Sequence, residues 1–180
     1  PALPAAGGCP APVESSDNQW IEIANRSAGP IALDGWEFND GVSFVFPAGV
    51  SLAAGEHACI ARDELAFANA YPGARLLGEF DGGLSRSSER IHLRDHNKNP
   101  VDEVRYHDSG RWPDAADGGG ASLELRDLDA DNSVAESWAA SDETAQSGWR
   151  DYTYGGTVTA SSGPDSKWSE FNMGLLGAGE

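Results

Sequence analysis

Apolar and polar residues alternate along several short stretches of this chain. In residues 20–24, Ile21 and Ile23 fall on one side of an extended backbone, whereas Glu22 and Ala24 fall on the other. Alternation with a period of two is typical of a β-strand that buries one face. The same alternation, or a short apolar run between turn residues, predicts further strands at 31–38, 42–46, 56–62, 76–80, 89–94, 101–106 and 121–126.

The stretch 89–94 shows the pattern well, with Ile91 and Leu93 facing inward and charged or polar residues facing outward. Turn residues separate the strands. The Asn-Asp-Gly sequence at 39–41 is a strong turn signal, so we expect 31–38 and 42–46 to form a hairpin. Many short strands at regular spacing predict an all-β sandwich.

One segment, 64–71, predicts a short helix. Asp63 stands where a helix N-cap is expected, and Pro72 with Gly73 ends the segment. The predicted apolar side of this helix consists of Leu65, Ala66, Phe67 and Ala70.

Composition divides the chain into three parts. Residues 1–18 are rich in Pro, Ala, Gly and Ser, which is typical of an arm or linker. Residues 19–141 contain the strand patterns and are expected to form the sandwich. Residues 142–180 are Gly- and Ser-rich with scattered aromatic residues, and we interpret them as a β extension, the truncated start of a second β domain.

Charge narrows the set of partners. The chain carries 29 acidic and 12 basic residues, for a formal net charge of −17. Nucleic-acid binding depends on Lys and Arg displacing counterions, so a nucleic-acid partner is not expected. No apolar run approaches the roughly 18 residues that a membrane span requires, so membrane insertion is not expected either.

Several motifs together resemble the lamin tail domain family. Residues 20–25, Trp-Ile-Glu-Ile-Ala-Asn, look like its apolar-Glu-apolar strand ending in Asn, and Leu33-Asp34-Gly35-Trp36 resembles its Leu-x-Gly-Trp bend. Further similarity lies in 46–56, 84–95, 101–106 and 122–126. The bend also has a physical basis, because Asp34 can accept a hydrogen bond from its own turn and Trp36 can supply core volume.

The resemblance implies an immunoglobulin-like β-sandwich of the bacterial exported type. It implies a non-catalytic interaction or spacer module in a multidomain protein, extracellular or at the cell surface, with a protein or cell-surface glycan as partner and no cofactor. The chain departs from the family at its start, because residues 1–18 offer no clear apolar first strand. A missing first strand leaves a sheet edge open to another chain.

The alternative function is a calcium-stabilised carbohydrate-binding region. Residues 163–176 look like the opening strands of a carbohydrate-binding jelly roll, and exposed aromatic rings form sugar-binding platforms. The candidate ligand-binding residues in this part of the chain are Trp149, Tyr152, Tyr154 and Trp168. Packing in a core is the alternative fate of these rings.

A turn rich in carboxylates is the candidate calcium site. Oxygen ligands at alternate positions of a tight loop suit Ca²⁺. The candidate ligands are Asp127, Asp129, Asp131, Asn132 and Glu136. The motif is incomplete, because the sixth position is Asn rather than Gly and the twelfth is Trp rather than an acid. Plain turn chemistry is the alternative reading.

The chain has two cysteines, Cys9 and Cys59, which would form one disulfide in an exported protein or stay as two thiols. His92, His96 and His107 could meet at one end of a hairpin and bind a metal, with surface histidines as the alternative. Common hydrolase, phosphate-loop and Cys-x-x-Cys motifs are missing. The remaining enzymatic hypothesis uses dispersed acid and base residues, namely Asp102, Glu103 and His107.

Overall fold

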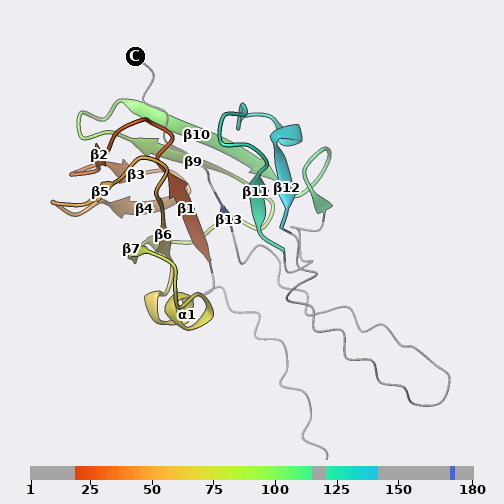
Figure 1. Cartoon of the computed structure of the whole chain (residues 1–180). Helices are drawn as coiled ribbons and strands as arrows, with labels where there is room; N and C mark the ends of the chain where they lie inside the picture. Colours follow the sequence, from red (N-terminus) through yellow and green to blue (C-terminus); the bar gives the residue numbers. More distant parts are fainter. Residues whose placement is uncertain (1–18, 115–120, 142–170, 173–180) are drawn as a thin grey trace, which may run out of the picture.

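The computed structural model describes residues 19–114, 121–141 and 171–172, and it shows an all-β sandwich with one short α-helix. Two sheets make up the sandwich (Figure 1). The six-stranded sheet has the order β12 (Trp138–Ala140), β11 (Leu123–Leu125), β13 (Phe171–Asn172), β1 (Trp20–Ala24), β6 (His57–Ala61) and β7 (Leu76–Glu79). The five-stranded sheet has the order β10 (Pro100–His107), β9 (Ser88–Arg94), β3 (Glu37–Phe38), β4 (Val42–Val45) and β8 (Asp81–Gly82).

A small ladder pairs β2 (Ile31–Ala32) with β5 (Ser51–Leu52). The helix α1 spans Glu64–Ala70, and a 3₁₀-helix spans Ala135–Ser137 just before β12. None of the described helices is long and apolar enough to cross a membrane.

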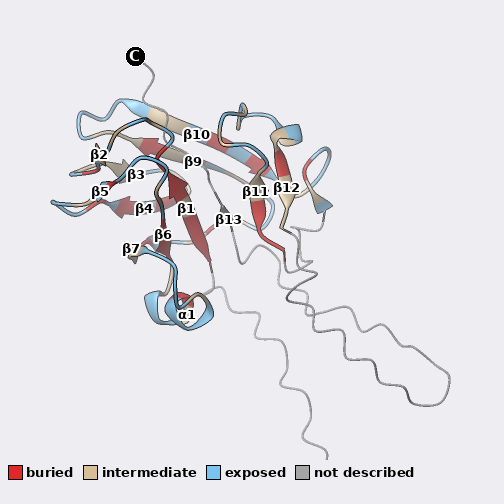
Figure 2. Cartoon of the chain, viewed as in Figure 1, coloured by how far each residue is buried: buried red, intermediate tan, exposed pale blue. Residues whose placement is uncertain are grey.

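The main core lies between the two sheets, where Figure 2 shows β1 and parts of other strands in red. It joins Ile21 and Ile23 of β1 to Ile91 and Leu93 of β9, each at most 1% exposed. The inward faces predicted for both strands are therefore confirmed. Leu123 of β11 is buried in the same cluster.

The predicted strand at 31–38 is wrong as a single element. Its two ends form β2 and β3, which belong to different sheets. The backbone turns between them, with Gly35 at a φ of 69° and Trp36 N–H donating to Leu33 O at 3.0 Å. Asp34 does not accept from its own turn, because its carboxylate accepts from the N–H of Gly49.

The hairpin turn at 39–41 is confirmed, and glycine is required there. Phe38 of β3 pairs with Phe44 of β4 on either side of the turn. Gly41 has a φ of 78°, and a Cβ at this position would lie 2.8 Å from the carbonyl oxygen of Arg90. A side chain would therefore strain the turn and collide with β9.

The helix and its N-cap are confirmed, but α1 ends at Ala70, one residue before the predicted end, and its apolar side is smaller than predicted. Asp63 caps α1 by accepting a hydrogen bond from Ala66 N–H at 2.8 Å. Phe67 packs edge-on against Trp20, with ring centroids 5.9 Å apart. Leu65 and Ala70, both predicted to face inward, are exposed, Leu65 to 78%, because a helix of this length buries only the side that carries Phe67.

Candidate functional site

The carboxylates of the acidic turn stabilise the turn itself. Asp127 Oδ1 accepts a hydrogen bond from Asp129 N–H at 2.9 Å. Asp131 Oδ1 accepts from the N–H and the hydroxyl of Ser133 at 2.9 and 2.6 Å, and these bonds lower the pKa of Asp131. Such contacts are typical of turns in which an Asp side chain binds backbone two residues further on.

The same turn is also fastened to the sandwich. Asn132 Nδ2 donates to Asp102 Oδ1 of β10 at 2.8 Å, and the indole N–H of Trp138 donates to the carbonyl of Asn132 at 2.9 Å. Arg26, just after β1, donates to the carbonyl of Leu128 and lies 3.6 Å from Asp129. The turn therefore ties the β11–β12 hairpin to β10 of the five-stranded sheet and to the segment that follows β1.

The structure gives the acidic side chains structural partners, and it leaves calcium binding untested. Glu136 pairs with Arg111 at 2.7 Å, outside the turn. Across residues 19–114 and 121–141, no three Asp, Glu, His or Cys side chains gather as a metal-binding group. Calcium at this turn stays a prediction. Calorimetric titration of the chain with CaCl₂ tests it, since an ion held there gives a saturable heat that Asp131→Asn removes.

Among the described carboxyl groups, Asp102 shows the clearest rise in pKa, and its burial is the main cause. Desolvation raises the pKa of Asp102 from 3.8 to about 6, although Asn132 Nδ2 and Glu103 N–H both donate to this carboxylate. A group whose pKa is higher in the folded state favours folding only while protonated. Its contribution is therefore present near pH 4 and is lost as the pH rises through 6.

Asp102→Asn should stabilise the fold at neutral and alkaline pH. The amide keeps an oxygen that can accept from Asn132, and it removes the buried charge. We expect the free energy of unfolding to rise by about 2 kcal/mol at pH 8 and to be unchanged near pH 4. Urea denaturation at both pH values measures this difference, with Glu103→Gln on the exposed neighbouring carboxylate as control. An equal gain at both pH values would contradict the role of charge.

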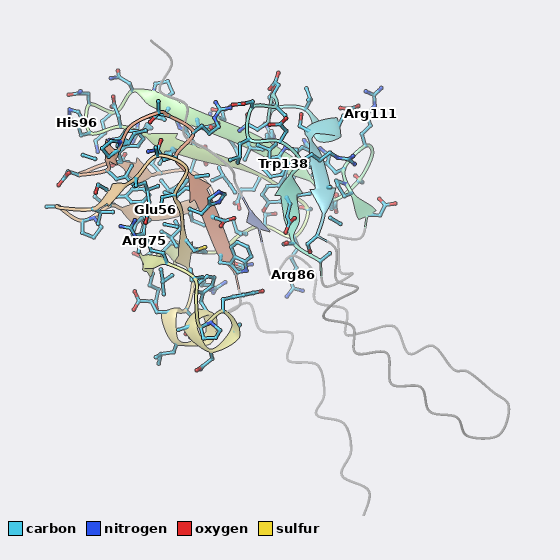
Figure 3. The ribbon with its side chains drawn as sticks, in the orientation of Figure 1. Glu56, Arg75, Arg86, His96, Arg111 and Trp138 are labelled. Carbon is cyan, nitrogen blue, oxygen red and sulfur yellow. The ribbon has the colours of Figure 1, made fainter. Side chains whose placement is uncertain are left out.

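The histidines do not converge, so that prediction is wrong. In the antiparallel β9–β10 pair, His92 lies opposite Glu103, whereas His107 lies opposite Ser88 near the other end of the ladder. Figure 3 shows His96 in the turn that joins the two strands, far along the hairpin from Trp138. Strand alternation alone does not say which residues of β9 and β10 lie opposite each other. The observed register does, and it separates His92 from His107.

The dispersed acid and base residues also occupy separate places. Asp102 faces the acidic turn, and Glu103 pairs with Arg90 at 3.3 Å. His107, at the end of β10, stacks beside Trp112 with ring centroids 6.3 Å apart. Five residues of extended strand separate Asp102 from His107 by roughly 16 Å. These side chains cannot act on one reacting atom together in this arrangement.

A surface groove lies along the β11–β12 hairpin, and its cationic side chains already have partners. Arg111, Arg126 and Trp138 are among its lining residues. Arg126 Nε donates to the carbonyl of Trp138 at 3.0 Å, and Arg111 pairs with Glu136. Figure 3 shows Arg111 and Trp138 on this side of the molecule.

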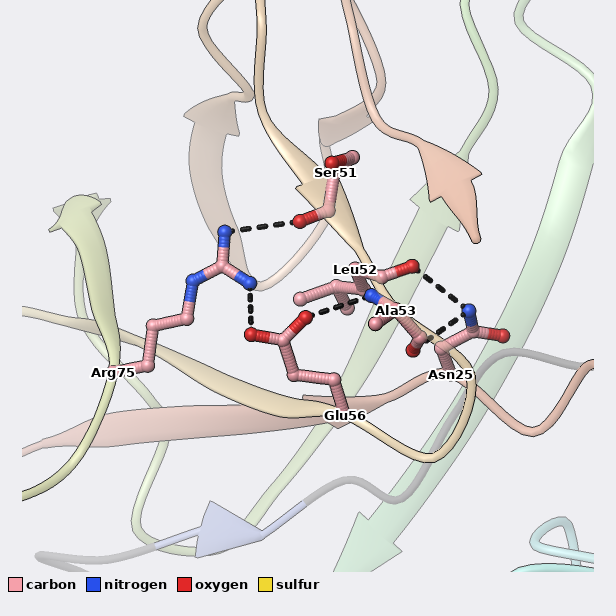
Figure 4. A network of polar contacts seen from close by, with 6 residues as sticks. All are labelled: Asn25, Ser51, Leu52, Ala53, Glu56 and Arg75. Atoms are coloured by element: carbon pink, nitrogen blue, oxygen red, sulfur yellow. Dashed lines mark hydrogen bonds and ion pairs between the residues drawn. The ribbon is translucent and has the colours of Figure 1, made fainter. Parts of the chain in front are cut away.

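Asn25 joins two segments of backbone, 27–29 and 52–53, to the end of β1, and it was quoted in the sequence only as the end of a strand motif. Its fully buried amide nitrogen donates to the carbonyls of Gly29, Leu52 and Ala53 at 2.8, 3.0 and 3.0 Å. Its oxygen accepts from the N–H and the hydroxyl of Ser27. Figure 4 shows the amide beside the 52–53 backbone.

Glu56 extends this network to the surface. Its carboxylate accepts from Ala53 N–H at 2.7 Å and pairs with Arg75, and these two contacts lower the pKa of Glu56. Arg75 also donates to the carbonyl of Ser51 at 2.9 Å (Figure 4). The network fastens the 51–56 turn to the ends of β1 and β7.

Cys59 is buried on β6 and has no disulfide partner among the described residues, and burial raises the pKa of its thiol to about 12. The thiolate is the reactive form, so we expect native Cys59 to react with a disulfide reagent at pH 8 at least about a thousandfold more slowly than an exposed thiol. The same reaction is then measured in urea, where unfolding exposes the Cys59 thiol and the reaction should be rapid. Fast labelling of the folded chain would contradict the burial of this thiol.

The remaining predicted site residues lie outside the described residues. They are Cys9, Trp149, Tyr152, Tyr154 and Trp168. The Cys9–Cys59 disulfide therefore stays a prediction, which the intact mass of the unreduced chain tests. The roles of the four aromatic residues, and the boundaries of the arm and the extension, stay predictions in the same way.

Sequence reasoning placed strands at 163–176 but did not identify which strands of the sandwich they pair with. β13 runs parallel to β1, with Phe171 paired to Ile21 and Asn172 paired to Glu22. On its other side Phe171 pairs with Leu123 of β11. Figure 1 shows β13 between these two strands. Two residues near the end of the chain carry no periodic signal from which this pairing could be read.

Comparison with known proteins agrees with this architecture. No curated protein matches the chain. The model of the Lamin Tail Domain family matches residues 10–108, which run from before β1 to just after β10. That match covers more than half of the chain, and the immunoglobulin-like sandwich expected from the sequence is the fold observed. The chain therefore belongs to the lamin tail domain family.

Proposed function

We propose that this chain is a non-catalytic interaction module of an exported, multidomain bacterial protein. Lamin tail domains are non-catalytic β-sandwich modules with structural and interaction roles. The observation that carries the proposal is that the side chains singled out for chemistry serve the fold. Asp102 accepts a hydrogen bond from Asn132. Glu103 forms an ion pair with Arg90, and Glu136 forms one with Arg111.

The acidic composition supports a place outside the cell. A net charge of −17 keeps a protein soluble and repels anionic polymers. We propose an extracellular or cell-surface location, where a protein or a surface glycan is the partner. Protease accessibility of the tagged parent protein in intact cells tests this location, and protection from added protease in intact cells would contradict it.

Measurements of binding test the interaction role, and measurements of turnover test the absence of catalysis. We expect the full chain to bind a cell-envelope protein or glycan saturably and to turn over no member of a hydrolase panel. Turnover that is lost in both Asp102→Asn and His107→Ala would contradict the non-catalytic part. Absence of saturable binding to purified envelope proteins, sacculi and a glycan array would contradict the interaction part.

A further inference from the structure

β10 forms one edge of the five-stranded sheet (Figure 1). It spans eight residues, Pro100–His107, and among the described strands it pairs only with β9. The strand and the segments on either side of it lie within the described range 19–114. An edge strand of this length presents a row of backbone groups to which another strand can bond.

The ladder with β9 determines which residues of β10 direct their backbone outward. Directly after the strand, Asp108 N–H donates to Ser87 O at 2.7 Å, so the even-numbered residues of β10 bond toward β9. By the same alternation, Glu103 and Arg105 direct their N–H and C=O groups to the open edge. Among the described residues, the one partner of these groups is Asp102 Oδ1, which accepts from Glu103 N–H at 2.6 Å.

Arg105 is an exposed cation that forms no ion pair within the described part of the chain. The residue directly opposite it in the ladder is Arg90, which carries the same charge. Arg90 is compensated, because it pairs with Asp40 and, at 3.3 Å, with Glu103. Like charges directly opposite each other destabilise a sheet, so a single copy of the chain leaves an unfavourable cation at this edge.

A second copy of the chain can supply the partner that Arg105 lacks. When β10 pairs antiparallel with itself about a two-fold axis at Val104, Glu103 of each copy lies opposite Arg105 of the other. Both residues direct their backbone to the edge, so Arg105 N–H of each copy can donate to Glu103 O of the other. An axis at Arg105 would instead place two arginines opposite each other, and an axis at Glu103 would do the same with two glutamates.

We propose that β10 pairs with β10 of a second copy about the axis at Val104 and joins two five-stranded sheets into one. Two ion pairs between Glu103 and Arg105 then accompany the main-chain hydrogen bonds. The contact is small and each copy carries a net charge of −17, so the dimer is weak and reversible. Self-association is a property beyond the envelope binding proposed above.

Sedimentation equilibrium of the full chain in about 150 mM salt tests the pairing, because salt screens the long-range repulsion between copies. We expect dimer to form with increasing concentration up to about 0.5 mM chain. Arg105→Glu places a glutamate opposite Glu103 in both pairs and should weaken the dimer at least about tenfold. Arg86→Glu is the matched control, because it makes the same charge change at an exposed arginine outside β10, and it should leave the dimer unchanged.

A mixture of two variants locates the contact and its register. Glu103→Arg and Arg105→Glu should each self-associate at least about tenfold more weakly than the unmodified chain. When the two variants are mixed in equal amounts, each arginine at these positions lies opposite a glutamate of the other variant. The mixture should therefore dimerise at least as tightly as the unmodified chain, a recovery that unfolded variants could not give.

Three outcomes overturn the proposal. They are a chain that stays monomeric up to about 0.5 mM, a dimer that Arg105→Glu weakens no more than Arg86→Glu does, and a mixture of variants that does not recover. Each leaves the interaction role intact, because binding to an envelope component is measured separately with dilute chain. Loss of that binding while the dimer forms as expected contradicts the interaction role and not the pairing of β10.

Discussion

Replacing Asn25 by Ala should lower the free energy of unfolding by about 3 kcal/mol, because buried polar groups lose their partners. The Asn25 side chain is fully buried and bonds to the carbonyls of Gly29, Leu52 and Ala53. Alanine leaves these carbonyls without the amide, and it also removes one of the two acceptors of the Ser27 hydroxyl, whose other acceptor is the carbonyl of Gly29. The loss is large because one side chain bonds to two segments that are remote from each other in the chain.

The network explains why few substitutes are acceptable. Asn25→Asp keeps an acceptor for Ser27 but turns a carboxylate oxygen toward the carbonyls, so it should cost at least as much as Ala. Asn25→Ser keeps a hydroxyl that is too short and has too few donors to bond both the 27–29 and the 52–53 segments. The end of β1 and the 51–56 turn should therefore loosen together in each variant.

Urea denaturation of Asn25→Ala and of a matched control measures the effect. Asn97→Ala removes an exposed asparagine whose amide contacts His96 in the β9–β10 turn, and it should change stability by less than about 0.5 kcal/mol. Similar midpoints for the two variants would show that the buried amide does not support the fold as argued.

The scaffold could be predicted where one short stretch of sequence carries its own signal. Alternation identified β1 and β9, an Asn-Asp-Gly turn identified the β3–β4 hairpin, and Asp63 identified the start of α1. Each signal is local. The sequence also marked Asn25 as the last residue of a strand motif, but not its bonds to Leu52 and Ala53, since these partners are remote in the chain.

The errors arise where the structure depends on register or on remote pairing. The stretch 31–38 alternates like one strand, yet the Asp34–Gly35 bend sends its ends to different sheets. β12 lies among turn residues and is three residues long, so no periodicity marks it. Calcium at the acidic turn stays a prediction for a different reason, because the spacing of the turn is the same whether its carboxylates bind an ion or their own backbone.

Truncating Trp138 to Ala should lower the free energy of unfolding by about 4 kcal/mol, because it empties a fully buried site. Trp138 is 1% exposed and belongs to the same core cluster as Trp112 and Leu123. Its ring lies 6.1 Å from that of Trp112. Its indole N–H donates to the carbonyl of Asn132, and the side-chain amide of Asn132 donates to Asp102 of β10.

The location of Trp138 gives this result a wider meaning. The family match ends at residue 108, whereas Trp138 lies on β12, beyond that match. If the hairpin of β11 and β12 were an appendage, its loss would leave the sandwich stable. Because Leu123 and Trp138 are buried in the common core, we expect one cooperative unfolding transition at a lower urea concentration.

Two further variants separate volume from hydrogen bonding. Trp138→Phe keeps an aromatic ring and loses the bond to Asn132, so it should cost about 1–2 kcal/mol beyond any change in packing. Val134→Ala trims a side chain that is 42% exposed in the same segment and should be nearly neutral. An unchanged midpoint for Trp138→Ala, or a separate early transition for β11 and β12 in hydrogen exchange, would instead make the hairpin an independent unit. The sandwich proper would then end near β10.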